Sequence, residues 1–262
     1  MTNGNSVLQE GDMLLLVDQK DRRYLLTLKS KSEFHSHSGY ISHDDLIGKK
    51  DGVRIKSSGG LEYLALRPTM SDVILKMPRS AQIIYPKDIG PILIAADIAA
   101  GNKVLESGIG SGALSIALLR AGASVTGIEL REDFAKRARK NVESFFSDQN
   151  ISERYEVLIG DAYNQLNGSD YDRIVLDLPE PWRVIDHVEN TLRPGGILVS
   201  YSPSITQVSR LTDRLREDNF AMTKTQEILS RSWHVDGRAV RPDHRMVAHT
   251  GFITSTRYLG SQ

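Results

Sequence analysis

The fold is decided by the stretch Lys103–Arg120, which reads KVLESGIGSGALSIALLR. It begins with a short apolar run, passes through a glycine-rich turn and ends in an apolar segment of helical character. We predict a strand at Lys103–Glu106 and a helix at Ala113–Arg120. A glycine loop between a strand and a helix lets a ligand approach the backbone and the N–H groups that open the helix. This stretch therefore predicts a nucleotide site.

Strands and helices alternate along the rest of the C-terminal part. We predict strands at Ser124–Glu129, Tyr155–Ile159, Arg173–Leu178 and Ile197–Tyr201, with two more near Ala221–Leu229 and Val247–Arg257. We predict helices at Glu132–Phe146, at Trp182–Leu192, closed by Pro194-Gly195-Gly196, and at Thr206–Glu217. This alternation is typical of a doubly wound α/β sheet with Rossmann-like topology.

The N-terminal part has a different pattern. Short β segments are expected at Met13–Val17, Arg23–Leu28, Val53–Ile55 and Tyr63–Leu66, with turn residues such as Ser38-Gly39 between them. We expect a small all-β domain, a barrel or a sandwich, over residues 1–75 and a catalytic α/β domain over residues 76–262.

Composition limits the classes of protein that fit. The 262 residues are 40% hydrophobic and 25% charged, which is the balance of a folded protein with a sizeable core. The absence of cysteine excludes disulfides, thiolate catalysis and cysteine-ligated metals. The polar N-terminus has no signal peptide and the apolar runs are too short to cross a bilayer, so we expect a cytoplasmic protein without a membrane span. No carboxylate pattern of a metal site accompanies His35, His37 and His43, and imidazoles on polar loops are usually solvated, so we expect no metal.

The glycine loop carries an acidic residue at its head. A carboxylate at Glu106 would repel a pyrophosphate but suits a ligand with an ammonium and a sulfonium group, which favours S-adenosylmethionine over a dinucleotide. The alternative is a glycine turn that merely packs. The residues of this loop that we expect to bind the cofactor are Glu106, Gly108, Gly110, Ser111, Gly112, Ala113 and Leu114.

Two further carboxylates end the next predicted strands. Glu129 is placed to accept both ribose hydroxyls of an adenosyl group. Asp161 is placed to accept from the adenine amino group, with Leu130 offering an apolar face to the ring and Ala162 beside it. The alternatives are a solvated strand end for Glu129 and a helix N-cap for Asp161.

The string Asp177-Leu178-Pro179-Glu180-Pro181-Trp182 follows the fourth predicted strand. Its prolines fix an extended turn beside the reactive end of the ligand. It is similar to the Asp/Asn-Pro-Pro-aromatic signature of methyltransferases that act on amino or ring nitrogens of bases. Asp177 can hold the exocyclic amine of adenine and stabilise the charge on an alkylated ring, and Trp182 can stack on the base. A purely structural turn is the alternative.

Taken together, these motifs make the chain resemble the tRNA (adenine-58-N1)-methyltransferase family in its single-subunit prokaryotic form, from about residue 10 to the C-terminus. Besides Glu106–Gly112 and Asp177–Trp182, the matching stretches are Phe34–His37, Met77–Arg79, Gln82–Asp88, Ser204–Val208, Arg241–His244 and His249–Phe252.

The resemblance implies a small N-terminal β domain, a seven-stranded methyltransferase domain and a homotetramer that acts on tRNA with S-adenosylmethionine. It also implies that Asp177 is the catalytic aspartate, that Tyr85 lies in the substrate pocket and that the segment with Gln82 lies over the cofactor. A helix that starts after Pro86 explains the neighbouring Lys87 and Asp88 equally well. The lack of cysteine departs from members whose tetramers contain disulfides. Methylation of adenosine 57 stays open.

Zero net charge means that RNA binding needs a local basic patch. The best candidate strip contains Arg231, His234, Arg238, Arg241, His244, Arg245 and His249. We expect Arg241, His244, Arg245 and His249 to contact tRNA, although an interface between subunits explains the strip equally well. Two other functions remain: an NAD-dependent dehydrogenase, and a non-catalytic RNA-binding subunit with a decayed methyltransferase fold.

Overall fold

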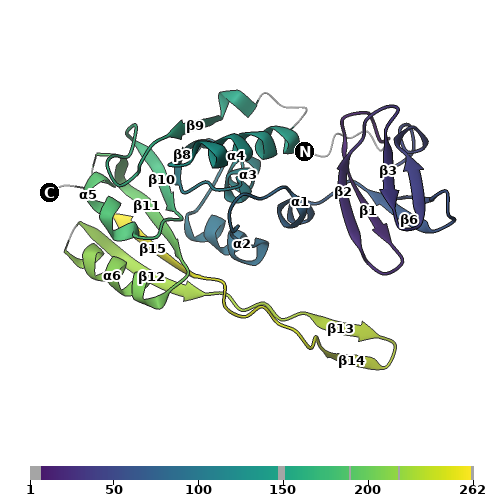
Figure 1. Cartoon of the computed structure of the whole chain (residues 1–262). Helices are drawn as coiled ribbons and strands as arrows, with labels where there is room; N and C mark the ends of the chain where they lie inside the picture. The colour runs from purple at the N-terminus through teal and green to yellow at the C-terminus, as the bar shows by residue number, and fades with distance from the viewer. Residues whose placement is uncertain (1–6, 147–150, 189, 218, 261–262) are drawn as a thin grey trace. The chain divides into compact units, whose positions relative to one another are not determined.

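The computed structural model describes residues 7–146, 151–188, 190–217 and 219–260. Its backbone contacts divide the chain into two compact units. One contains Met1–Pro78 and Glu143–Gln149, and the other contains Arg79–Val142 and Asn150–Gln262. We call them the β unit and the α/β unit, and describe each by itself (Figure 1).

The β unit has an antiparallel four-stranded sheet in the order β2-β1-β6-β5, and a separate hairpin, β3–β4. Its elements are β1 (Met13–Asp18), β2 (Arg23–Thr27), β3 (Glu33–Ser36), β4 (Gly39–Ser42), η1 (His43–Asp45), β5 (Val53–Lys56), β6 (Glu62–Leu66) and α1 (Met70–Lys76). The four predicted strands correspond to β1, β2, β5 and β6.

The hairpin β3–β4 was not predicted, because its polar sequence reads as a turn region. Two of its side chains are apolar and reach the core: Ile41 of β4 is buried, and the ring of Phe34 packs against Tyr24 and Tyr63 with centroids 5.1 and 5.9 Å away. Tyr63 is fully buried in a core that also contains Leu14 and Leu16 of β1. One side chain from each strand thus attaches the hairpin to the core of the sheet.

The α/β unit is built on a seven-stranded sheet in the order β12-β15-β11-β10-β7-β8-β9. Strands β7 to β11 are parallel, while β15 runs antiparallel to both β11 and β12. The strands are β7 (Lys103–Ser107), β8 (Ser124–Glu129), β9 (Tyr155–Ile159), β10 (Tyr171–Leu176), β11 (Leu192–Ser202), β12 (Phe220–Glu227) and β15 (Phe252–Tyr258). The helices are α2 (Pro86–Ala95), α3 (Ala113–Arg120), α4 (Glu132–Phe145), η2 (Ile151–Glu153), η3 (Pro181–Val184), α5 (Ile185–Val188) and α6 (Ile205–Arg216).

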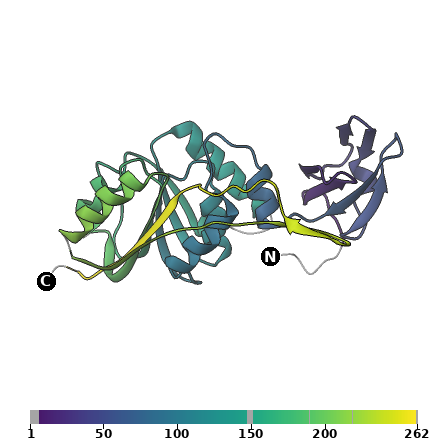
Figure 2. The ribbon, with the colours of Figure 1, turned by 90° about the horizontal axis from the view of Figure 1, so that it is seen from below.

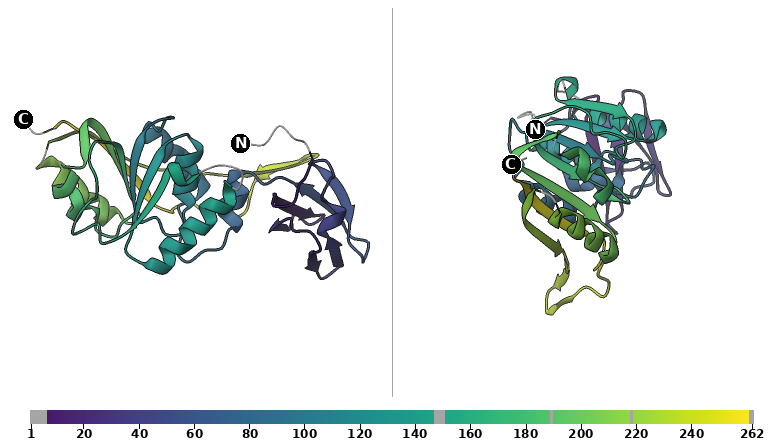
Figure 3. Two further views of the ribbon diagram at one scale, coloured as in Figure 1. Left: turned by 90° about the horizontal axis from the view of Figure 1, so that it is seen from above. Right: turned by 90° about the vertical axis from the view of Figure 1, so that its left-hand side faces the viewer.

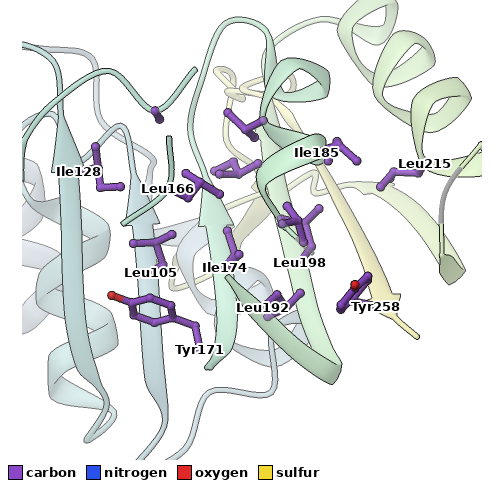
Figure 4. Packing of buried hydrophobic residues seen from close by; sticks show 14 of the residues in the cluster. Leu105, Ile128, Leu166, Tyr171, Ile174, Ile185, Leu192, Leu198, Leu215 and Tyr258 are labelled. Carbon is purple, nitrogen blue, oxygen red and sulfur yellow. The ribbon is translucent and has the colours of Figure 1, made fainter. Parts of the chain in front are cut away.

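Side chains on both faces of this sheet are buried. Leu105, Ile174 and Leu198 project from adjacent strands into a cluster that includes Ile185 of α5 and Leu215 of α6 (Figure 4). Their neighbours in the strands, such as Val104 and Val175, point to the opposite face and are also buried. Burial on both faces explains the continuous apolar strands and confirms the doubly wound α/β fold.

The order of the sheet reverses between β7 and β10. From β7 the chain continues to β8 and β9 on one side, whereas β10 and β11 lie on the other. Ligands of such sheets bind beyond the carboxyl ends of the strands at this reversal. The glycine loop follows β7 and Asp177 follows β10, so both lie at this point.

The predicted helix at Trp182–Leu192 was wrong in its C-terminal half. Helical structure ends at Val188, and Leu192 already begins β11. Pro194-Gly195-Gly196 does not close a helix but lies within β11, where the register to β10 shifts between Tyr171 and Arg173. Proline and glycine are tolerated in a strand at such an irregularity, because the ladder there needs no N–H donor. Strand β10 also starts and ends two residues earlier than predicted.

A second hairpin, β13 (Trp233–Asp236) and β14 (Ala239–Pro242), was not predicted. Figures 1 and 2 show that it projects from the ends of β12 and β15, and both views in Figure 3 agree. The hairpin lies between the last two predicted strands. The last of these strands, β15, begins at Phe252 rather than near Val247. Within the described residues, no helix is long and apolar enough to span a membrane.

Candidate active site

A cavity of about 350 Å³ lies at the carboxyl ends of β7, β8, β9 and β10. A smaller one of about 20 Å³ adjoins it beneath the glycine loop, and Gln82, Gly108, Gly110 and Asp177 line both. Both cavities are formed by residues of the α/β unit alone. They occupy the place that the strand order predicts for a ligand.

The structure brings most of the predicted cofactor residues together. The large cavity is lined by Gln82, Gly108, Gly110, Glu129, Leu130, Asp161, Ala162 and Asp177, and the small one adds Glu106, Ser111, Ala113 and Leu114. Gly112 lines neither. It is the N-cap of α3 with φ +83°, and a Cβ there would approach the backbone of Ala138 to 3.2 Å, so it serves the close packing of α3 on α4.

Gly108 brings the glycine loop against the turn that follows β10. Its φ is +84°, and a Cβ at this position would lie 2.1 Å from the carbonyl oxygen of Asp177. The backbone N–H of Asp177 donates to the carbonyl of Ser107 at 2.9 Å. Only glycine permits this approach, which holds the backbone of Asp177 beside the loop.

Glu129 is buried and joins two loops at the rim of the cavity. One carboxylate oxygen accepts from the backbone N–H of Gly110 at 3.0 Å, and the other accepts from Arg131 N–H at 3.1 Å. The carboxylate is therefore ordered rather than a solvated strand end. Each oxygen keeps a lone pair for a further donor.

Asp161 lines the cavity and also organises its own turn. Its carboxylate accepts from the backbone N–H of Tyr163 at 2.9 Å and from the side chain of Asn164 at 3.4 Å. Nearby on the cavity wall, Leu130 is 66% exposed, which is unusual for a leucine. The wall thus combines a fixed carboxylate with an open apolar surface.

The electrostatics of the two cavities are dominated by carboxylates. Glu106 is buried and accepts from Ser115 Oγ at 2.6 Å. Burial, reinforced by the charges of Asp177 and Glu129, raises the pKa of Glu106 to about 8. Burial and the charge of Glu129 raise the pKa of Asp177 to about 7. Among the described residues, no ion pair joins Glu106, Glu129 or Asp177 to a cation, so the site favours a positively charged ligand.

One polar atom at the cavity is available for a ligand. Ser107 lines the large cavity, and its Oγ is buried without a hydrogen-bond partner within residues 7–146, 151–188, 190–217 and 219–260. Buried polar groups are normally paired, and an orphaned one beside a cavity indicates a missing partner. Arg131, the cation in the wall, pairs with Asp133 at 2.8 Å.

Two predicted substrate residues, Tyr85 and Trp182, line neither cavity. Tyr85 is the half-buried N-cap of α2. Trp182 packs against the core cluster beneath α5 and α6, with the guanidinium of Arg210 5.3 Å from its ring centroid. Their expected contact with a base stays a prediction.

The segment after Tyr85 serves as an anchor. Asp88 in the first turn of α2 is fully buried and accepts from Lys87 Nζ at 2.8 Å, Thr250 Oγ1 at 2.6 Å and Tyr201 OH at 3.4 Å. Burial and the adjacent carboxylate of Asp88 raise the pKa of Tyr201 to about 12. Lys87 and Asp88 therefore begin α2 and tie it to β11 and to the segment before β15.

Several residues that line the large cavity were not predicted, namely Ala81, Ser107, Ile128, Arg131, Phe134, Gly160, Tyr163, Leu178 and Pro179. Tyr163 is the most informative, because its hydroxyl accepts from the backbone N–H of Glu180 at 3.0 Å. This bond joins the loop after β9 to the turn after β10. Its position two residues after Asp161 was the available signal.

The basic strip is divided in the structure. Arg241, His244 and Arg245 are exposed on β14 and the segment after it. His249 instead contacts Glu227 Oε1 through Nδ1 at 2.7 Å and the Pro203 carbonyl through Nε2 at 2.9 Å. The bond to Glu227 raises the pKa of His249. His249 thus ties the end of β12 to the end of β11.

The chain is similar to known tRNA methyltransferases. The model of the family described as "tRNA methyltransferase complex GCD14 subunit" matches residues 62–250, and the one described as "TrmI-like N-terminal" matches residues 7–55. The tRNA (adenine(57)-N(1)/adenine(58)-N(1))-methyltransferase TrmI of Methanocaldococcus jannaschii is 36% identical over 93% of this chain and 94% of its own. The tRNA (adenine(58)-N(1))-methyltransferase TrmI of Thermus thermophilus is 34% identical over 93% and 96%.

Solved structures extend the likeness to three dimensions. A Thermotoga maritima protein described as a SAM-dependent O-methyltransferase superposes with a TM-score of 0.91 at 31% identity, covering 99% of this chain and 98% of its own. The tRNA (m1A58) methyltransferase TrmI of Aquifex aeolicus superposes with a TM-score of 0.82 at 28% identity, covering 97% and 100%. By the extent of these matches, the chain belongs to the tRNA methyltransferase complex GCD14 subunit family.

Proposed function

We propose that this chain transfers a methyl group from S-adenosylmethionine to N1 of adenosine 58 in tRNA. Family membership and the names of the relatives supply the substrate and the position. The observation that carries the proposal is the carboxylate-lined cavity between the glycine loop and the turn after β10. One relative is named for adenosine 57 as well as adenosine 58, and the other for adenosine 58 alone.

The residues of the cavity fit S-adenosylmethionine. Ser107 Oγ, which has no partner within the described residues, and the buried carboxyl groups of Glu106 and Asp177 fit a polar, cationic ligand. In this proposal, Glu129 accepts the ribose hydroxyls with its remaining lone pairs, and Asp161 and Leu130 receive the adenine. Glu106 attracts the positive charge of the ligand from beneath the loop.

S-adenosylmethionine supplies a methyl group that is already activated by the sulfonium. The chain must therefore position the acceptor and stabilise the charge that develops on it, and a strong external base is not required. The target base has to be turned out of the tRNA elbow to reach the cavity. Asp177 accepts from the adenine N6 amine and stabilises the ring as it becomes cationic in a site that excludes water.

A cationic ligand also prepares Asp177 for this role. With a pKa of about 7, the carboxyl group carries a proton for much of the time near neutral pH. A positive charge in the adjoining cavity lowers that pKa and favours the carboxylate. Binding of the cofactor thus makes Asp177 a better acceptor for the N6 amine.

The same electrostatics argue against a dinucleotide. A pyrophosphate at the glycine loop would lie beside Glu106, Glu129 and Asp177, and the pKa of Glu106 is already raised by burial and, in addition, by the charges of the other two. A further negative charge there is unfavourable. A decayed, non-catalytic subunit is disfavoured as well, because the loop, Glu129 and Asp177 are intact and meet at one cavity.

The hairpin β13–β14 is our candidate for assembly and for tRNA contact. It exposes Trp233, Val235 and Val240 at 58%, 70% and 58%, while Arg241 and Arg245 are exposed beside them. Exposed apolar side chains on a projecting ribbon suit burial against another subunit. We propose a homotetramer in which this hairpin is an interface, with the two arginines near tRNA phosphates. A cytoplasmic location, where tRNA is found, is part of the proposal.

Transfer of labelled methyl groups to tRNA tests the proposed function. The purified chain alone is incubated with labelled S-adenosylmethionine and unmodified tRNA, and the products are compared with those from tRNA in which adenosine 58 is replaced by guanosine. We expect about one methyl group per unmodified tRNA and strong loss of transfer to the substituted tRNA. If neither tRNA is methylated, the proposed function is wrong. If both are methylated equally, the target is a nucleotide other than adenosine 58.

A further inference from the structure

The β unit contains a cavity of about 430 Å³ that the proposed reaction does not use. It is formed by three turns at one end of the unit: the turn between β1 and β2, the turn between β3 and β4, and the turn between β5 and β6. It is lined by Asp18, Gln19, Lys20, Arg22, His37, Ser38, Gly59, Gly60 and Leu61. His37 comes from Phe34–His37, a stretch that the active site leaves without a role.

The β3–β4 and β5–β6 turns are joined by hydrogen bonds. Ser57 Oγ donates to the Ser38 carbonyl at 2.6 Å, and the backbone N–H of Gly59 donates to the same carbonyl at 3.2 Å. Gly59 leaves no room for a side chain, because a Cβ there would lie 2.4 Å from that oxygen. The walls of the cavity are therefore preformed, which lowers the entropic cost of binding a ligand.

The lining of the cavity has a net positive charge, since it contains the cations Lys20 and Arg22 and the single carboxylate of Asp18. The Asp18 side chain is 1% exposed and accepts from the backbone N–H groups of Lys20 and Arg22 at 2.9 and 3.0 Å, and from Arg22 Nε at 2.6 Å. A second nitrogen of the Arg22 guanidinium, Nη2, lies 3.0 Å from His37 Nε2. Two partners thus fix the orientation of Arg22, although 43% of its side chain stays exposed.

Lys20 provides the second cation. Its side chain is at the tip of the β1–β2 turn, and no carboxylate of the described residues lies within ion-pairing distance of its ammonium group. An oriented guanidinium beside a mobile ammonium is the combination that proteins use for phosphate groups. Gln19 and the apolar Leu61 line the same cavity and suit the hydroxyls and the carbon face of a sugar.

We propose that this cavity binds one phosphate and the adjoining ribose of the RNA backbone, with Arg22 and Lys20 as the phosphate ligands. The inference rests on the proposed function, which supplies the RNA. The chain has zero net charge, so its affinity for a polyanion must come from such local clusters. The site binds backbone rather than bases, because its lining contains no large aromatic ring for stacking.

Binding of unmodified tRNA at a series of salt concentrations tests the site in the full chain. Lys20→Glu reverses an exposed charge without touching the fold, and Arg22→Gln keeps a donor for Asp18. Lys50→Glu is the matched control, because it makes the same charge change on an exposed residue at the other end of β5. We expect Lys20→Glu to weaken tRNA binding about tenfold and Arg22→Gln to weaken it several-fold. Each should lower the slope of log affinity against log salt concentration by about 1. The affinity of Lys50→Glu should stay within about twofold of the wild type.

Two further readouts separate this inference from the proposed function. Cofactor affinity and turnover at saturating tRNA should be unchanged in all three variants, since their positions lie in the β unit. Ethylation interference should identify a tRNA phosphate whose modification weakens binding to the wild type but does not weaken binding to Lys20→Glu. The inference is wrong, while the proposed function stands, if Lys20→Glu and Arg22→Gln bind tRNA with the same affinity as Lys50→Glu. It is also wrong if every phosphate that interferes with binding to the wild type interferes equally with binding to Lys20→Glu. A wild type that binds tRNA through this site without methylating it would overturn the proposed function instead.

Discussion

A Cβ on Gly108 would lie 2.1 Å from the backbone carbonyl oxygen of Asp177, so the glycine loop packs directly against the backbone of the residue that carries the proposed catalytic carboxylate. Gly108 also has a φ of +84°, which other residues rarely adopt. Any side chain at Gly108 must push the Asp177 turn away. This contact couples the glycine loop of β7 to the position of the reactive group after β10.

Gly108→Ala should therefore remove most methyl transfer. The displaced carboxylate loses its position relative to the base, and we expect turnover to fall by about 10²-fold, as for other small displacements in active sites. Gly101→Ala is the control, because Gly101 has a similar φ of +86° but open space around a new Cβ. Both variants should lose about 1–2 kcal/mol of stability from the backbone strain. Equal activity in the two variants would mean that the contact is irrelevant.

Asp177→Ala and Asp177→Asn should lower turnover while leaving cofactor affinity within several-fold of the wild type. The hydrogen bond that Asp177 accepts from the N6 amine strengthens as the adenine ring gains charge, so its loss acts on the chemical step, by about 10² to 10³-fold. The asparagine variant keeps the shape and loses the charge. Single-turnover rates on unmodified tRNA and separate calorimetric titrations measure the two effects. Near-normal rates in both variants would leave the turn with only a structural role.

The affinity for S-adenosylmethionine should rise as the pH increases from about 6 to about 9. Glu106, with a pKa of about 8, holds a proton at neutral pH, and a cation binds better once that proton has left. Calorimetry in buffers of different ionisation enthalpy should detect proton release on binding. Glu106→Gln should flatten the pH dependence of the affinity. Any pH dependence left in this variant comes from the amino group of the ligand itself. An unchanged pH profile in Glu106→Gln would exclude this role.

The raised pKa of Glu106 also has a consequence for stability. Between the ordinary value of 4.5 and about 8, the folded chain holds a proton on Glu106 that the unfolded chain has released. The free energy of unfolding should therefore fall as the pH rises through this window, and Asp177 adds to the fall between its ordinary value of 3.8 and about 7. Urea denaturation at several pH values should show a shallower fall in Glu106→Gln. A wild-type stability that rises from pH 5 to pH 8 would contradict the burial of an uncompensated carboxyl group.

The double variant Arg241→Ala, Arg245→Ala should weaken tRNA binding and flatten its salt dependence, by about 1 in slope for each lost phosphate contact. Both side chains are exposed, so the fold of the α/β unit should persist. Light scattering on the same samples reports the oligomer. A monomer with an unchanged salt slope would assign these residues to the interface alone.

The sequence was most informative where local and global signals agree. Strand β8 and helix α3 have their predicted bounds, because glycine turns mark both ends of the helix and the start of the strand. Glu129 and Asp161 were found at the cavity because the carboxyl ends of parallel strands meet at one edge of the sheet. Such residues are placed by topology, which the strand pattern already determines.

Features that depend on distant partners were not predictable. The hairpin β13–β14 has exposed apolar strands whose burial, in our proposal, needs a second subunit, and its short strands flank a polar turn. The hydroxyl of Tyr163 accepts a hydrogen bond from the backbone of Glu180, and only the place of Tyr163 two residues after Asp161 pointed to the site. Pro194-Gly195-Gly196 reads as a helix end, and only the irregular register of β11 explains it as part of a strand.

Mass-spectrometric mapping of the reaction product tests the central claim most directly. Unmodified tRNA is incubated with the wild-type chain and S-adenosylmethionine, digested, and analysed for the position and chemical site of each new methyl group, with Asp177→Ala in parallel. The account predicts 1-methyladenosine at position 58 with the wild type, and little or none with Asp177→Ala. A methyl group on a ribose or other oxygen, as the name of the Thermotoga relative would suggest, or none on adenosine N1, would contradict it.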